Sequence, residues 1–188
     1  SLVVRELVRR RYAEQEAAGV RLIDVLGALK DWAGAYSWSR NRLRSYVAPF
    51  EYEEMVSRAA AALRELDAGW ALTLLAGMDR VAPHVQHGQV HLYVRPADFG
   101  RAEAKLRATL HLEPVTHGGN FHLLEPHYAV SAFFGQREVG GLQVVSDIQL
   151  YLDLVGYPVR GSESAEMLLR SGLGQALGLE PRQYGDLL

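Results

Sequence analysis

The segment Val90–Val94, with the sequence VHLYV, constrains the fold more than any other part of the chain. It is mainly apolar and lies between Gly88 and Pro96. Short runs of branched and aromatic residues bounded by turn formers are typical of β-strands. Helical patterns precede and follow it, over residues 74–81 and 97–110. The sequence therefore predicts a fold that mixes strands with helices.

Helical spacing of apolar residues recurs elsewhere in the chain. Asp24 is expected to cap one of these helices. The apolar run Trp70–Thr73 predicts a buried strand. The other predicted helices cover residues 3–17, 24–36, 39–47, 51–66, 148–155 and 163–169.

The pattern changes between residues 112 and 145, where turn residues recur and separate short apolar runs. This is typical of small antiparallel strands. The runs cover residues 121–124, 130–134 and 142–145, and the tail after residue 169 is expected on the surface. The fold class that follows is α+β, with a small mixed or antiparallel sheet flanked by helices.

The length of 188 residues allows one good-sized domain, or one domain and a fragment. We expect residues 1–50 to form a helical arm and residues 51–188 to form one compact α+β domain.

The chain has no cysteine, which excludes disulfides, thiolate zinc sites and cysteine nucleophiles. Arginines stand where a secretory signal would be apolar, and no apolar run approaches the ~18 residues of a membrane span. A cytoplasmic protein without membrane contact is expected by elimination.

The net charge of −2 hides an asymmetry along the chain. Residues 1–50 hold nine basic and five acidic residues, a balance of +4, whereas the rest holds 11 basic and 17 acidic residues, a balance of −6. A basic end is expected where a chain faces a polyanion, although solvated helix surface would give the same pattern. The candidate nucleic-acid contacts are Arg9, Arg10, Arg11, Arg40, Arg42 and Arg44, the last three interleaved with Trp38 and Tyr46.

The strand Val90–Val94 also suggests a comparison with nucleotidyltransferases, which hold catalytic metals with two carboxylates on such a strand. Residues 87–94 contain no Asp or Glu, and Leu74 and Leu75 stand where a phosphate loop would have Gly and Ser. One hypothesis is a degenerate nucleotidyltransferase-like scaffold without the active site. The alternative is a β–α–β layout of the kind that recurs in unrelated folds. The scaffold hypothesis fails if Val90 and Leu92 do not lie beside that loop.

No catalytic residue, cofactor site or metal site is predicted. Zinc needs three or four converging ligands, and two histidines that flank a turn do not imply convergence with a third in mid-strand. The two groups in question are His84, His87 and His91, and His117, His122 and His127. Ser146 before an apolar helix is interpreted as an N-cap.

Arg160 stands in a turn just before a predicted helix. We expect it to pair with Asp153 or Glu163 and so to fix two helices against each other. Anion binding is the alternative, because a guanidinium suits carboxylates and phosphates equally.

Four segments together resemble the AbiEi family of antitoxins and transcriptional regulators in type IV toxin–antitoxin systems. The fourth is the most specific, and the order and spacing of the segments hold over about residues 20–170. They cover residues 32–41, 70–94, 133–141 and 145–166.

The resemblance implies a winged-helix DNA reader followed by an effector domain. Residues 2–23 resemble only the end of a winged helix, and Ser1 in place of Met favours a trimmed piece of a longer protein. The implied partners are DNA, through the full-length protein, a functional link to a nucleotidyltransferase-type toxin, and a second copy of the chain. Two alternatives stay open, a divergent nucleotidyltransferase or nuclease and a stand-alone regulator without a toxin.

Overall fold

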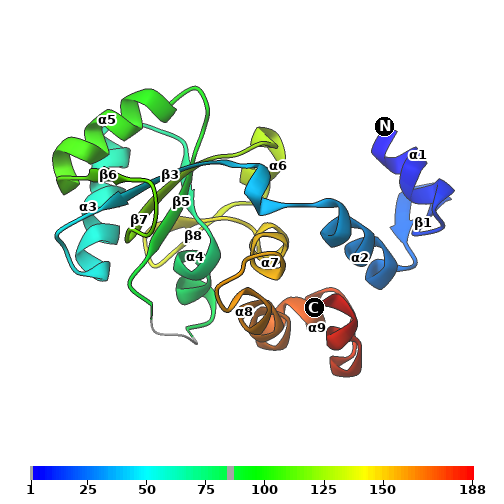
Figure 1. The fold of residues 1–188 in the computed structure, drawn as a ribbon. Coiled ribbons are helices and arrows are strands. Elements are labelled where there is room, and N and C mark those ends of the chain that lie inside the picture. The colour runs from blue at the N-terminus through cyan, green and yellow to red at the C-terminus, as the bar shows by residue number, and fades with distance from the viewer. Residues whose placement is uncertain (1, 84–86) are drawn as a thin grey trace.

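The computed structural model describes residues 2–83 and 87–188, and its centre is a seven-stranded mixed sheet (Figure 1). The strand order is β6-β3-β7-β5-β4-β9-β8. The α+β prediction, with a mixed sheet flanked by helices, is confirmed. The strands are β3 (Arg42–Val47), β4 (Trp70–Leu72), β5 (Val90–Val94), β6 (Glu113–Val115), β7 (Phe121–Glu125), β8 (Arg137–Val139) and β9 (Leu142–Val144).

The predicted strand β5 lies at the middle of this sheet and is buried along its whole length. It pairs parallel with β7 and antiparallel with β4. β3 runs antiparallel to both β7 and β6. Because successive side chains on a strand point to opposite faces, β5 supplies residues to two separate cores.

One face of the sheet is covered by α3 (Tyr52–Glu65) and α5 (Phe99–Leu110). Val90 and Leu92 of β5 pack there, with Leu63 of α3 and Leu106 of α5, and all four side chains are fully buried.

The opposite face carries α4 (Leu74–Val81), α7 (Asp147–Val155) and α8 (Gly161–Leu168), with the short helix α6 (Ala129–Phe133). Tyr93 of β5 points into this second core. Ser146 caps α7 as predicted, because its hydroxyl accepts a hydrogen bond from the backbone N–H of Gln149.

Residues 2–35 form a unit that lies to one side of the sheet (Figure 1). It consists of α1 (Leu2–Arg9), the hairpin of β1 (Ala13–Glu16) and β2 (Gly19–Leu22), and α2 (Val25–Ala35). Asp24 caps α2 by accepting from the backbone N–H of Gly27 at 2.8 Å, as expected. The predicted helix over residues 3–17 was too long, since it ends at Arg9 and β1 follows.

Two predicted elements have the wrong type. Residues 39–47 form a short 3₁₀ turn (Trp38–Arg40) and then β3, because the sheet supplies strand partners on both sides. The sheet thus takes a strand from the segment assigned to the arm. Residues 130–134 fall mainly in helix α6, where Ala132 and Phe133 pack inward while Val130 and Phe134 face solvent.

The tail after residue 169 was predicted to lie on the surface. Instead, part of it folds back onto the second core. Leu179, Tyr184 and Leu187 are buried there. The hydroxyl of Tyr151, on α7, donates to the backbone carbonyl of Leu187 at 2.6 Å. The tail contains the π-helical turn Leu169–Leu173, α9 (Gly174–Ala176) and the 3₁₀ helix Pro181–Leu187. Among the described residues, no helix is both long enough and apolar enough to cross a bilayer.

Candidate functional site

A buried carboxylate lies where the arm joins the body. Asp153, on the inner side of α7, is fully buried and accepts hydrogen bonds from four neutral side chains. Thr73 donates at 2.5 Å, Tyr93 at 2.9 Å and Gln149 at 3.0 Å, and the fourth donor is the hydroxyl of Tyr36. Three of these donors converge on Oδ1, and Thr73 bonds Oδ2, so both oxygens of the acid are held from inside the protein.

Burial without a cationic partner sets the protonation of this cluster. Loss of solvation raises the pKa of Asp153 to about 6, against the opposing effect of its four donors. Burial raises the pKa of Tyr36 and of Tyr93, and the nearby carboxylate acts in the same direction. The two phenols therefore stay protonated and serve as donors.

The linker between α2 and β3 is held by this cluster. Its Asn41 donates from Nδ2 to the Tyr93 hydroxyl at 2.8 Å and accepts from the backbone N–H of His127 at 2.9 Å. Trp38 donates from Nε1 to the carbonyl of Gly156 at 2.9 Å. The segment 32–41 that resembles the family's linker thus has a structural role, the attachment of the arm to the body.

Two stacked histidines lie on the same face of the sheet. His91 of β5 is opposite His122 of β7, with ring centroids 4.4 Å apart and planes at 16°. His122 Nδ1 lies 3.0 Å from the Ser45 hydroxyl, and His91 Nε2 lies 3.3 Å from the Tyr157 hydroxyl. Within the described residues, His91 Nδ1 and His122 Nε2 are buried without a hydrogen-bond partner. Burial lowers the pKa of both rings, so the pair is neutral.

The sequence predicted no metal site at either group of three histidines, and the structure describes five of these six residues. His84 lies outside the described residues. Across residues 2–83 and 87–188, no three histidine or acidic side chains gather in a way that could hold a metal ion.

The condition that would have disproved the nucleotidyltransferase-like scaffold is not met. Leu92 is paired with Leu72, and the Thr73 backbone N–H donates to the His91 carbonyl at 3.1 Å, so β5 lies beside the start of α4. The strand itself carries no carboxylate, and Asp153 is enclosed by neutral donors.

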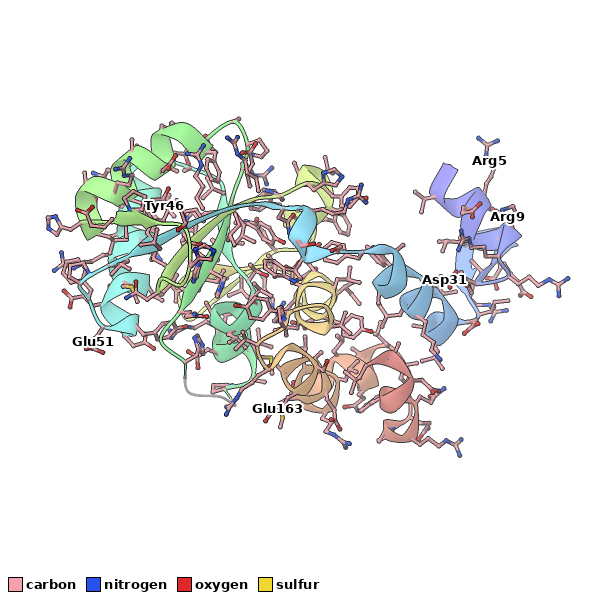
Figure 2. All side chains as sticks on the ribbon, viewed as in Figure 1. Arg5, Arg9, Asp31, Tyr46, Glu51 and Glu163 are labelled. Carbon is pink, nitrogen blue, oxygen red and sulfur yellow. The ribbon has the colours of Figure 1, made fainter. Side chains whose placement is uncertain are left out.

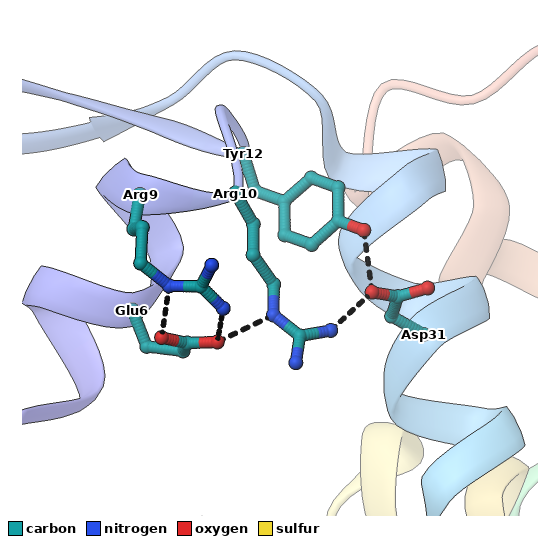
Figure 3. A network of polar contacts seen from close by, with 5 residues as sticks. All are labelled: Glu6, Arg9, Arg10, Tyr12 and Asp31. Carbon is teal, nitrogen blue, oxygen red and sulfur yellow. Dashed lines mark hydrogen bonds and ion pairs between the residues drawn. The ribbon is translucent and has the colours of Figure 1, made fainter.

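The arginines of α1 take part in a polar network with α2 (Figure 3). Arg9 and Arg10 both bind Glu6, at 2.5 and 2.6 Å. Arg10 also binds Asp31 of α2 at 2.6 Å, and Tyr12 donates to the same oxygen at 2.6 Å. Arg11 is exposed, with a left-handed φ of 63° at the end of α1.

The second arginine group does not form a single basic cluster. Arg44 pairs with Glu103, and Arg42 pairs with Glu125 at 3.4 Å. Arg40 donates to the Tyr128 hydroxyl at 3.0 Å and has no ion pair within the described part of the chain. Their nucleic-acid role stays a prediction.

Of the two partners expected for Arg160, Asp153 is ruled out by its position, and the pairing with Glu163 stays a prediction. Asp153 faces the core, whereas Arg160 is exposed in the turn before α8 with a φ of 55°. Gly161, the first residue of α8, packs closely on the end of α7.

The sequence contained a signal for Asp153 that was missed. It is an acid within the otherwise apolar helix 148–155, one turn after Gln149. Spacing in the sequence could not link this acid to Tyr36 and Tyr93, because its hydrogen bonds to them span 117 and 60 positions. Asn41 joins the cluster through the Tyr93 hydroxyl.

Comparison with known families then identifies the class of protein. The family model described as transcriptional regulator, AbiEi antitoxin, type IV toxin–antitoxin system matches residues 21–174. The chain belongs to this family.

Among solved structures, the crystal structure of ANT(2″)-Ia in complex with adenylyl-2″-tobramycin aligns with a TM-score of 0.45 and 14% sequence identity. The alignment covers 71% of this chain and 95% of that chain. No curated protein sequence matches the chain.

Proposed function

We propose that this chain is the effector part of a cytoplasmic antitoxin-type transcriptional regulator and that it is not an enzyme. The observation that carries the proposal is the AbiEi family match, which spans α2, the linker and the sheet with its helices.

The structure of residues 2–22 supports a DNA-reading role for the arm. A helix followed directly by a two-stranded hairpin is the order in which a winged helix places its recognition helix and its wing. These elements expose Val3, Val8 and Leu22, at 68%, 37% and 49%. A complete winged helix would bury such a surface under its other helices, so we propose that α1 and the hairpin belong to one.

The charges of the arm fit contact with a phosphate backbone. Arg5 and Arg9 extend from α1 on the side away from the sheet (Figure 2). The ion pair of Arg9 with Glu6 is exposed, and exposed pairs contribute little, so a phosphate can compete for that guanidinium. Arg10 differs from Arg9 in that it also binds Asp31 of α2, so its guanidinium bridges the end of α1 and α2.

The body from β3 to the C-terminus would then supply antitoxicity and assembly with a second copy. Direct toxin binding is not required by this proposal. A nucleotidyltransferase-type toxin is the proposed functional partner.

Growth rescue tests the antitoxin role. The nucleotidyltransferase-type gene beside this one would be induced in a host cell with the complete gene product, with the present chain, or with an empty vector. Rescue by both forms would support an effector role for the body. No rescue by the complete product would contradict the antitoxin role, and absence of such a neighbouring gene would favour a stand-alone regulator.

The enzyme alternative requires two or three carboxylates that face a pocket. In the described residues, the carboxylate that bonds a side chain of β5 is Asp153, which is fully buried and accepts from four neutral donors. Incubation of the chain with Mg²⁺, a nucleoside triphosphate and RNA is expected to give no nucleotide transfer, and metal-dependent transfer would overturn this part of the proposal.

A further inference from the structure

The short helix α6 presents an unusual surface. Val130 and Phe134 lie one helical turn apart and are 85% and 80% exposed. Trp32 of α2 and Tyr128 are also half exposed, at 50% and 45%. We call these four residues the α6 patch. Large apolar side chains that gather in an exposed patch mark an interaction site more often than a structural one.

Hollows lie on both sides of Phe134. The one between α6 and α7 has a volume of about 410 Å³, and Trp32, Ile148 and Gly135 are among the residues that line it. The one on the other side has a volume of about 530 Å³ and includes Pro96 and Phe133. The patch thus offers projecting side chains and adjoining recesses, which suits a partner that brings its own apolar side chains.

Two arginines without an ion pair in the described residues lie beside the patch, whereas the nearby acids Glu125 and Asp147 are paired with Arg42 and Arg137. Arg95 lies over the Phe133 ring at 4.6 Å and lines the second hollow, and Arg40 lies over the Tyr128 ring at 5.6 Å. Among described residues, no acid lines either hollow. Two cations already held on aromatic rings therefore flank an apolar centre.

We propose that the α6 patch docks an acidic amphipathic segment of a partner protein. Its apolar residues would pack against Val130 and Phe134, and its carboxylates would pair with Arg40 and Arg95. Preplaced guanidinium groups lower the entropy cost of such pairs. A second copy of this chain fits less well, because a two-fold contact would bring like charges together. The inference rests on this surface alone and does not depend on the DNA-reading role of the arm.

Selection from a phage library of random 16-residue peptides against the whole chain tests the proposal. Enriched peptides are expected to carry a net negative charge and two or more large apolar residues at spacings of three or four. Their affinity, measured by fluorescence anisotropy, should fall by about tenfold or more for Phe134→Ser, since central apolar anchors dominate such interfaces. The affinity should fall severalfold for Arg95→Gln at low salt, and the difference between this variant and the wild type should be smaller at high salt.

Val159→Ser is the matched control, because Val159 is 53% exposed in the turn between α7 and α8. It should leave peptide affinity unchanged. No enrichment of acidic amphipathic peptides, or enriched peptides that bind Phe134→Ser as tightly as the wild type, would overturn the proposal. Two other results would also overturn the proposal if no peptide binds. One is binding of a single-stranded oligonucleotide that Phe134→Ser abolishes, and the other is dimerisation in sedimentation experiments that Phe134→Ser abolishes.

Discussion

The hydroxyl of Tyr36, at the end of α2, donates a hydrogen bond to the buried carboxylate of Asp153 on α7, across 117 positions of sequence. The same hydroxyl accepts from Gln149 at 3.0 Å. Through this contact a fully buried acid of the body holds the first residue after the arm helix. The orientation of the arm is therefore coupled to the packing of α7 on the sheet.

Tyr36→Phe should lower the free energy of unfolding by about 1–3 kcal/mol, because a buried carboxylate loses one of its donors. Urea denaturation measures this change. Tyr128→Phe is the control, since the partner of its hydroxyl within the described residues is the exposed side chain of Arg40, and its loss should matter little. Equal stability of Tyr36→Phe and wild type would show that the contact does not hold the linker.

Asp153→Asn should remove a pH dependence of stability. The pKa of this acid is about 6 in the folded chain, against an ordinary value of 3.8 for an aspartic acid in an unfolded chain. Its contribution is fully present below pH 3.8 and is lost as the pH rises through about 6, because only the folded state holds the proton in that interval. As the pH is lowered from 7 to 4, the free energy of unfolding of the wild type should rise by on the order of 3 kcal/mol relative to that of the variant. Parallel pH profiles of the two proteins would be inconsistent with a buried, raised pKa.

The His91 and His122 pair should make the folded chain less stable as the pH falls, which is the opposite of the effect of Asp153. Their pKa values are lowered in the folded chain, so the unfolded chain takes up protons first as the pH falls below 6.5. Stability is therefore lost on acidification from that pH. His122→Phe keeps an aromatic ring on His91 and should flatten this loss between pH 7 and pH 5, as followed by thermal unfolding. A steeper loss in the variant would contradict neutral rings in the fold.

Gly161→Ala should destabilise the chain by about 1–3 kcal/mol, because a Cβ at this position would lie 2.1 Å from the backbone carbonyl oxygen of Leu154. That oxygen belongs to α7 and cannot move without the helix. Gly185→Ala, where an added Cβ meets nothing within 4 Å, is the matched control. Calorimetry of both variants separates close packing from a general effect of losing a glycine.

The strand Val90–Val94 and the helices on either side could be predicted because each one carries its own local pattern. β3 could not, since Arg42 to Val47 becomes a strand only through pairing with β7 and β6, which follow much later in the chain. Charge composition drew attention to Arg42 and Arg44, yet their acidic partners Glu125 and Glu103 are distant in sequence. The Asp153 cluster was missed for the same reason, because its donors come from α2, β5 and the start of α4.

Fluorescence anisotropy with the duplex upstream of the gene tests most directly whether this family member reads DNA through its arm. The complete gene product should bind that duplex with an affinity that falls steeply with salt, and Arg9→Gln should weaken binding and reduce the salt slope by about one. Arg182→Gln, which changes an exposed residue far along the chain from the arm, should bind as the wild type does. Salt-insensitive binding, or equal affinity for wild type and Arg9→Gln, would contradict the proposed role of the arm.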